Sequence, residues 1–384
     1  MNRTAIIYID NNSTTPIDPR VLDAMLLYLK ENFANPSSTH HFGQTINQRV
    51  KQAREQIADF IKAEPNEIIF TSGATEAINL AIKGVAEQYS AKGKHIITVS
   101  TEHSAVLDTC KHLERRGYEV TYLHTQINGL IDVSELKQAI RPDTILVSVM
   151  YVNNETGVIQ PIKEIASIAH EKGALFMTDA TQAVGKFEVD IDALEIDLLC
   201  FSGHKMYAPK GIGVLFLRQR ENKVKLTPQI HGGGHEQGLR SGTLNVPGII
   251  ALSKACEIAR QEMRHNKERI SELRDYLEFE LLNLPNTSLN GDKKHRLYNT
   301  SNICFKGHDA NVLIGRMKDI AVSNGSSCSS AIVAPSHVLK AMGLSDDDSF
   351  ASLRFSLGKL NTLEEVETVV KKIKELTQNN LNYA

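Results

Sequence analysis

The stretch Asp197-Leu-Leu-Cys-Phe-Ser-Gly-His204-Lys205 begins as an apolar strand pattern and ends in a lysine. A second apolar stretch just upstream, Ala174-Leu-Phe-Met-Thr-Asp179, ends in a carboxylate. In open α/β sheets, ligands gather at the carboxyl ends of the strands. We therefore expect Lys205 and Asp179 to lie at the same edge of one sheet.

An amine and a carboxylate at the ends of two successive strands are what a pyridoxal phosphate (PLP) enzyme requires. The lysine forms a Schiff base with the cofactor, and the acid keeps the pyridinium nitrogen protonated so that the ring accepts electrons. Either residue alone is more often a solvated charge at a strand end. The interpretation therefore depends on the rest of the chain.

Alternating helix and strand patterns from about residue 45 to 220 predict a mostly parallel sheet with crossover helices. Apolar residues recur at helical spacing from Ile46 to Phe60. The expected strands are 67–70, 95–99, 144–149, 174–177, 198–201 and 213–217. Farther on, a long helix is expected over 249–284, and a C-terminal helix over 362–376 begins with a capping box at Thr362 and Glu365.

Length and charge limit the function classes. A chain of 384 residues can form two domains. The net charge is −2 and there is no basic tail, which disfavours nucleic acid as a partner. No run of eighteen apolar residues predicts a membrane span, and the N-terminus lacks the pattern of a signal peptide. We expect a cytoplasmic protein.

The five cysteines are widely spaced, which excludes a disulfide framework and a CxxC metal pair. Four of them lie in apolar segments and are predicted to be buried: Cys110, Cys200, Cys256 and Cys304. Cys328 differs because it lies among small polar residues, Asn324-Gly-Ser-Ser-Cys328-Ser-Ser330. An accessible thiol in such a segment can act as a nucleophile. The alternative is an incidental surface cysteine.

A candidate phosphate site lies in Phe70-Thr-Ser-Gly-Ala74-Thr75-Glu76, between a strand and a helix. Backbone N–H groups and the helix dipole can hold a phosphate there. The alternative is a plain N-cap. The turn matches neither the Walker pattern nor GxGxxG. Ser202 and His204 flank Lys205 and can donate to the same phosphate, unless His204 is a surface histidine.

Further polar residues follow strand patterns. His103 can lie on the face of an aromatic cofactor and transfer protons, or be an exposed loop histidine. Asn154 and Gln182 offer amides to a cofactor oxygen or a substrate carboxylate, or simply form turns. Arg354 alternates with apolar neighbours, so it requires a partner: the carboxylate of an amino-acid substrate or an internal salt bridge.

Nearly the whole chain resembles the cysteine desulfurases of the NifS/IscS type, which are fold-type-I PLP enzymes. The matching segments are 8–16, 35–38, 72–76, 101–103, 152–155, 178–182, 202–205, 232–236, 240–243 and 354–358. The Ser/Gly-rich setting of Cys328 resembles the longer active-site loop of the first desulfurase group. Small departures are Gly203 where Ala is frequent, Ala208 where Gly is frequent, and Ala34 where Gly is common.

The resemblance implies an α/β fold, with a mostly parallel central sheet flanked by helices and a smaller α+β domain. A large PLP-binding domain is expected over 16–257. A small domain, comprising 1–15 and 258–384, carries the Cys328 segment. Thr243 is expected to reach the phosphate of a neighbouring subunit, which implies a homodimer.

The resemblance also implies the roles of the site residues. Lys205 carries PLP, Asp179 pairs with the pyridinium, Gln182 bonds the ring oxygen and His103 stacks on the ring. Arg354 and Asn154 hold the substrate carboxylate. The positions expected to contact the cofactor are Ala74, Thr75, His103, Asn154, Asp179, Gln182, Ser202, Gly203, His204, Lys205 and Thr243.

The implied reaction converts L-cysteine to L-alanine, with Lys205 and His103 moving protons and Cys328 taking the sulfur as a persulfide. A sulfur-acceptor protein such as an iron–sulfur scaffold receives it. Because the chain ends at Ala384 without the longer tail of IscS-type members, the acceptor is left open. The alternatives are a selenocysteine lyase, a sulfinate-desulfinating relative and a non-enzymatic sulfur-binding protein.

Overall fold

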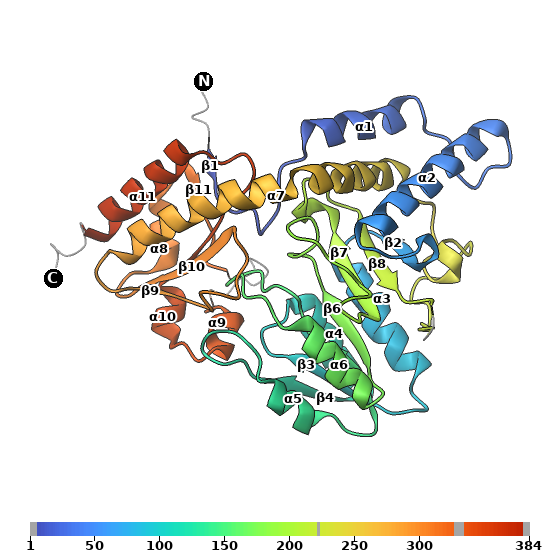
Figure 1. The fold of residues 1–384 in the computed structure, drawn as a ribbon, viewed down its shortest axis with the longest axis horizontal. Helices are drawn as coiled ribbons and strands as arrows, with labels where there is room; N and C mark the ends of the chain where they lie inside the picture. The colour runs from blue at the N-terminus through green and yellow to red at the C-terminus, as the bar shows by residue number, and fades with distance from the viewer. Residues whose placement is uncertain (1–5, 221–222, 326–333, 379–384) are drawn as a thin grey trace.

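The structure is a computed structural model that describes residues 6–220, 223–325 and 334–378 (Figure 1). Its largest sheet has seven strands in the order β2-β8-β7-β6-β5-β3-β4. Their bounds are β2 (Ile68–Thr71), β3 (His95–Val99), β4 (Glu119–Leu123), β5 (Thr144–Ser148), β6 (Leu175–Asp179), β7 (Leu198–Ser202) and β8 (Gly213–Leu217).

The predicted, mostly parallel sheet is confirmed. Each neighbouring pair from β7 across to β4 is parallel, whereas β8 runs antiparallel to both β7 and β2. The short connection after β7 explains this reversal, because a parallel return requires a crossover of a dozen residues or more. β4 was not predicted from the sequence, since it is an edge strand with an exposed Glu119 and a weak apolar pattern.

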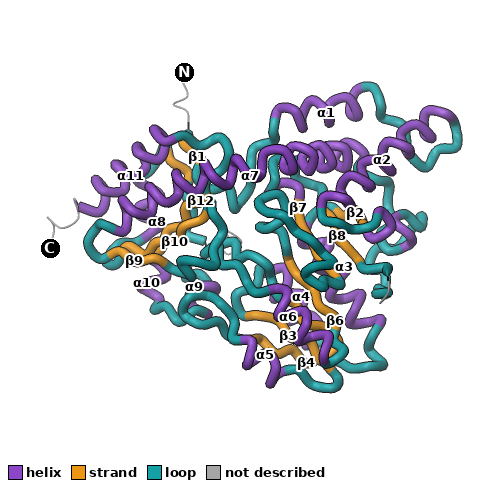
Figure 2. Tube along the Cα trace, in the orientation of Figure 1, coloured by secondary structure: helices purple, strands orange, loops and turns teal. Residues whose placement is uncertain are grey.

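Helices cover both faces of this sheet (Figure 2). One face packs against α3 (Ala74–Gln88) and α4 (Ser104–Glu114). The other packs against α2 (His41–Phe60), α5 (Val133–Ala139), α6 (Ile162–Glu171) and the first half of α7 (Val246–Leu282). α1 (Pro19–Lys30) lies along α7. This is the layered architecture that the alternating pattern predicts.

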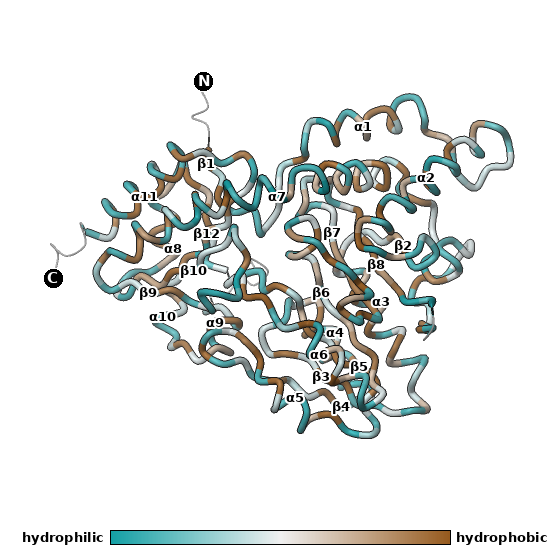
Figure 3. Tube along the Cα trace, in the orientation of Figure 1, coloured by the Kyte–Doolittle hydropathy of each residue, from teal (hydrophilic) through white to brown (hydrophobic). Residues whose placement is uncertain are grey.

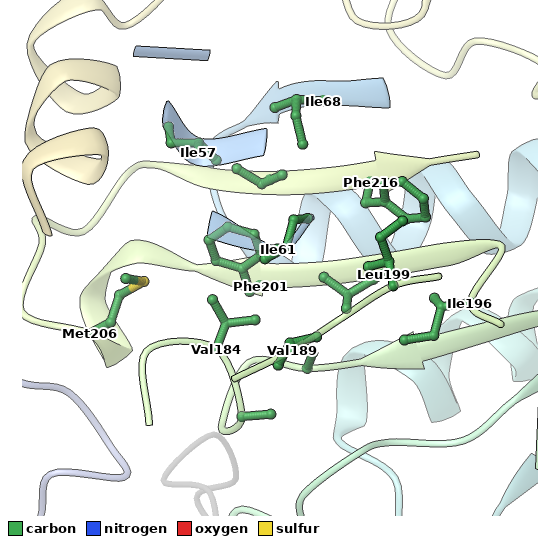
Figure 4. Close-up of a cluster of buried hydrophobic side chains, with 14 of the residues drawn as sticks. Ile57, Ile61, Ile68, Val184, Val189, Ile196, Leu199, Phe201, Met206 and Phe216 are labelled. Carbon is green, nitrogen blue, oxygen red and sulfur yellow. The ribbon is translucent and has the colours of Figure 1, made fainter. Parts of the chain in front are cut away.

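The strands alternate their side chains between two buried cores. On β7, Leu199 and Phe201 belong to one core, and Leu198 and Cys200 to the other. Figure 4 shows Phe201 beside Ile61 in the first core. In Figure 3, strands of this sheet are coloured toward brown, the hydrophobic end of the scale. Since both faces are covered, the central strands are mostly apolar, as buried strands of parallel sheets usually are.

A second, smaller assembly forms from the C-terminal part of the chain. Its antiparallel sheet has the order β12-β10-β9, and β1 pairs in parallel with β11. The strands are β1 (Ile7–Tyr8), β9 (Thr287–Leu289), β10 (Thr300–Phe305), β11 (Ile320–Ala321) and β12 (Ser352–Ser356). The helices are α8 (Ala310–Arg316), α9 (His337–Ala341), α10 (Asp346–Phe350) and α11 (Leu363–Gln378).

A third core joins the strands, α8 and α11 to the second half of α7 and to Ile9. The N-terminal segment therefore packs with the C-terminal part of the chain. The division at residues 16 and 258 stays a prediction, because α7 passes the second point without a break.

Two local predictions are confirmed. In the capping box of α11, Thr362 Oγ1 accepts from the Glu365 N–H at 3.3 Å, and Glu365 Oε2 accepts from the Thr362 N–H at 3.2 Å. The four cysteines of the apolar segments are all buried and unpaired. No helix in the described ranges has the length and apolar character needed to cross a membrane. Cys328 lies outside the described residues.

Candidate active site

A cavity of about 990 Å³ lies at the carboxyl ends of β6 and β7. Residues of the smaller assembly, among them Arg354 and Val322, border it on another side. The structure brings ten of the predicted site residues to this cavity: Ala74, Thr75, His103, Asn154, Asp179, Gln182, Ser202, His204, Lys205 and Arg354. Two described ones, Gly203 and Thr243, are not among its lining residues.

Lys205 lies in a short 3₁₀ turn, Gly203–Lys205, directly after β7. Its Nζ donates to the carbonyl oxygens of Asn12 at 2.7 Å and Ser13 at 2.5 Å. The pKa of Lys205 is lowered to about 8, mainly by burial and also by the charge of Arg354, while Asp10 and Asp179 oppose the shift. An amine with a lowered pKa loses its proton readily, as a Schiff-base lysine must.

Asp179 is the last residue of β6, and its register partner on β7 is Cys200. Its Oδ1 accepts from the Thr181 N–H at 2.9 Å, which orients the carboxylate. Nearby, Glu102 is fully buried, and its pKa is raised well above the usual range by burial and by the charge of Asp179. The raised pKa favours the neutral form of Glu102.

His103 caps the N-terminus of α4, and its Nδ1 accepts from the Ala105 N–H at 3.1 Å. The proton of the neutral ring therefore resides on Nε2. The ring faces the cavity, and the protein packed around it lowers its pKa, helped by Lys205 and His337. His103 thus offers a neutral imidazole with a fixed tautomer.

The candidate phosphate turn, Ser72–Thr75, connects β2 to α3. Ser72 N–H donates to Glu76 Oε2 at 2.9 Å, and Arg240 Nε donates to Glu76 Oε1 at 2.7 Å. The turn is packed tightly against the start of β8, because a β-carbon on Gly213 would lie 2.6 Å from Gly73 Cα. The first N–H groups of α3 have no partner within the helix, so the turn offers free donors of the kind that hold an anion.

His204 and Ser202 reach the same side of the cavity. His204 Nδ1 lies 3.1 Å from Thr14 Oγ1, and its pKa is lowered to about 4 by burial and by nearby lysines, Lys205 first among them. His204 is therefore a neutral hydrogen-bonding group near pH 7. Lys210, which sequence reasoning missed, also lines the cavity and adds positive charge.

Arg354 is buried on β12 and points at the N-terminal segment. Its Nη2 donates to Asp10 Oδ1 at 2.6 Å and Ser13 Oγ at 2.7 Å, and its Nη1 to the Asn154 carbonyl at 3.0 Å. The internal salt bridge considered as the alternative is thus present. Arg354 Nε is buried without a partner among the described residues, so the guanidinium retains a donor.

Several residues of the site had no role assigned from the sequence, and Thr243, which had one, lies elsewhere. Asn12 and Ser13 hold Lys205 through backbone carbonyls, which no side-chain motif reveals. Lys186 is buried behind Gln182 and donates to its side chain. Only the separation of four residues between the two could have indicated this contact from the sequence. Thr243 is exposed and outside the cavity. Gly325 and Ala334, on either side of the Cys328 segment, both line the cavity.

The fold and the site match known proteins closely. The sequence matches the family described as aminotransferase class-V over residues 7–369, and the chain belongs to that family. It is 50% identical over 370 residues to cysteine desulfurase IscS of Methylococcus capsulatus, covering 96% of this chain and 92% of the relative. With IscS of Escherichia coli K12 it shares 49% identity over 372 residues, at the same coverage.

Solved structures agree. A NifS-like protein superposes with a TM-score of 0.91 at 38% identity, covering 97% of this chain and 99% of the other. The structure of SspA in complex with cysteine superposes with a TM-score of 0.81 at 39% identity, covering 91% and 98%. The resemblance to NifS/IscS-type desulfurases that the sequence motifs indicated is therefore confirmed.

Proposed function

We propose that this protein is a PLP-dependent cysteine desulfurase, which converts L-cysteine to L-alanine and leaves the sulfur on Cys328. The observation that carries the proposal is the meeting of Lys205, Asp179 and His103 in one cavity. The named relatives at about 50% identity and a structural neighbour in complex with cysteine support the same activity.

The residues that line the cavity suit PLP. Lys205 supplies an amine whose pKa is lowered to about 8. Thr75, Ser202 and His204, with the first N–H groups of α3, provide the neutral donors that hold a phosphate. Asp179 is a buried carboxylate of the kind that keeps a pyridinium nitrogen protonated. When bound, PLP supplies an electron-accepting ring for the Cα of the substrate.

The side chains around the ring move the protons. Lys205 Nζ takes the proton from the substrate Cα, since its lowered pKa makes it a competent base near neutral pH. His103 presents Nε2–H to the cavity and assists proton transfer at the substrate sulfur. Arg354 and Asn154 hold the substrate carboxylate, and the unpartnered Arg354 Nε is the donor left for it.

Cys328 accepts the sulfur. Its thiolate Sγ bonds to the substrate sulfur while the bond from that sulfur to Cβ breaks. The electron pair stays with Cβ, which takes up a proton, and Cα regains the proton that Lys205 removed, so that alanine forms. Gly325 and Ala334 line the cavity, so the segment that carries Cys328 begins and ends there. The resulting persulfide passes to a sulfur-acceptor protein such as an iron–sulfur scaffold, in the cytoplasm.

The active unit is a homodimer. The α1 helix, the loop after it and the start of α2 leave large apolar side chains exposed, among them Leu22, Leu29, Phe33 and Phe42. Exposed apolar clusters of this kind mark protein interfaces. Thr243 is exposed on this chain and lies outside its own cavity. A second copy of the chain that covers the α1–α2 surface accounts for the exposed apolar side chains. It also accounts for the position of Thr243, which then reaches the phosphate site of the partner.

The activity is tested by measuring alanine and persulfide formation from L-cysteine by the PLP-loaded protein. Selenocysteine and cysteine sulfinate are compared at equal concentration. The proposal predicts alanine from L-cysteine and its loss in Lys205→Ala. Equal turnover of sulfinate by Cys328→Ser and wild type, with no persulfide in either, would contradict the desulfurase assignment.

A further inference from the structure

Lys186 is a buried lysine that lies behind the cavity residue Gln182, and the reaction described above does not use it. Its side chain is only 7% exposed, and its Nζ donates to Gln182 Oε1 at 2.9 Å. Within the described ranges, no carboxylate forms an ion pair with it. Burial lowers the pKa of Lys186 to about 7, and the charge of Lys205 adds to the shift.

The hydrogen bond from Lys186 fixes the side-chain amide of Gln182 at its oxygen. Gln182 Nε2 donates to the Asn12 carbonyl at 2.9 Å, which fixes the amide at its nitrogen. A backbone carbonyl only accepts, so the Asn12 oxygen requires the NH2 end of the amide and leaves Oε1 toward Lys186. Turning the amide over would place oxygen against oxygen and N–H against N–H. Gln182, which lines the cavity, therefore faces it with a donor.

The same Asn12 carbonyl accepts from Lys205 Nζ at 2.7 Å. Lys186, Gln182, the Asn12 carbonyl and Lys205 thus form one hydrogen-bonded chain. Lys186 also contributes to the lowered pKa of His204, so its charge is felt across this part of the site. The charged group that acts on Lys186 is Lys205, and its positive charge lowers the pKa of Lys186 in the same direction as burial does.

We propose that Lys186 is a positioning residue that acts through Gln182 to loosen the proton on Lys205 Nζ when the cofactor is attached. The inference rests on the proposed function, in which Gln182 bonds the phenolic oxygen of PLP. That oxygen otherwise shares the proton of the Lys205 nitrogen. A donor from Gln182 occupies the oxygen and weakens its hold on the proton.

The test is a pH titration of the visible absorbance of the PLP-loaded protein. In Lys186→Met the pH midpoint is expected to rise by about one unit relative to wild type. Lys163→Met, which changes an exposed lysine of α6, is the matched control and is expected to leave the midpoint in place. An unmoved midpoint in Lys186→Met overturns the inference.

A double-mutant cycle separates positioning from direct charge repulsion. In a Gln182→Leu background, Lys186→Met is expected to add little further shift, because its route to the cofactor is already gone. A full additional shift would overturn the role through Gln182. If Lys186→Met misfolds, Lys186→Gln replaces it in the test, because glutamine keeps a hydrogen-bond donor. Its pH midpoint is expected to shift less than that of Gln182→Leu. An equal shift would contradict the positioning role of Lys186.

The outcome is distinguishable from failure of the proposed function. A wild-type protein that shows no visible band with PLP would reject the proposed function itself. A wild-type band whose midpoint does not respond to Lys186 rejects only the positioning role.

Discussion

Gly203 faces the methyl group of Ala208 across the turn that carries Lys205. A β-carbon on Gly203 would lie 3.1 Å from Ala208 Cβ and 2.9 Å from Ile212 Cγ2. The turn is closed by hydrogen bonds from the Met206 and Ala208 N–H groups to the Gly203 carbonyl, at 2.9 and 3.1 Å. The small residue at 203 and the methyl group at 208 therefore fit each other, which gives the two departures from the family pattern one common explanation.

This contact predicts a coupled pair of substitutions. Gly203→Ala is expected to destabilise the protein by about 1–3 kcal/mol, because the added methyl group overpacks a buried turn. Adding Ala208→Gly removes one of the two close contacts, so the double variant is expected to be more stable than the sum of the single effects predicts. Urea unfolding measures the coupling, expected to be about 0.5 kcal/mol or more. Strict additivity would contradict the account.

The buried carboxyl of Glu155 predicts a specific pH dependence of stability. Its Oε2 accepts from Ser336 Oγ at 2.5 Å, and burial raises its pKa to about 7 from 4.5. Between these values the folded protein binds more protons than the unfolded chain, so Glu155 stabilises the protein at low pH and this contribution is lost as the pH rises through 7. The loss amounts to about 3 kcal/mol.

Replacing Glu155 by Gln is expected to remove this loss. As the pH rises from 5 to 8, the unfolding free energy of Glu155→Gln would then increase relative to that of wild type. Glu164→Gln, at an exposed position of α6, serves as the control. Parallel pH profiles of wild type and Glu155→Gln would show that this carboxyl does not titrate near 7.

The environment of Arg354 predicts how substrate binding responds to a change of its shape. Lysine keeps the positive charge but loses the planar guanidinium, whose Nη groups bond the protein while Nε stays free for a carboxylate. Arg354→Lys is therefore expected to raise KM for L-cysteine by about tenfold or more, while PLP still attaches to Lys205. Steady-state alanine formation measures this. An unchanged KM would show that the Asp10 salt bridge is the whole role of Arg354.

Asp179 is expected to act through its charge. Asp179→Asn keeps the size of the side chain and an oxygen that can accept from the Thr181 N–H. The protein should fold and bind PLP, while alanine formation falls by about two orders of magnitude, because a neutral amide no longer stabilises the protonated ring. Binding is followed by visible absorbance and turnover by alanine release. A variant with wild-type turnover would contradict the role of Asp179.

Local patterns in the sequence predicted much of the fold and part of the site. The strand ends at Asp179 and Lys205 meet as expected, since successive parallel strands share one edge. The capping box of α11 formed because its partners lie three residues apart. Such features depend on near neighbours, and their residue types reveal them directly.

The contacts between distant parts of the chain could not be predicted. The Asn12 carbonyl that holds Lys205 lies 193 residues away in sequence, and Asp10 lies 344 residues from Arg354. A backbone carbonyl carries no signal in its residue type. The burial of Lys186 was missed for a related reason, because a lysine in a turn ordinarily faces solvent.

The attachment of the cofactor to one lysine is the claim on which the others depend. Reducing the PLP-loaded protein with borohydride makes the link permanent, and peptide mass spectrometry then locates it. The account predicts a single pyridoxyl group on Lys205 and none on Lys186, the other buried lysine beside the cavity. A modified peptide that carries the group elsewhere, or a protein that binds no PLP, would contradict it.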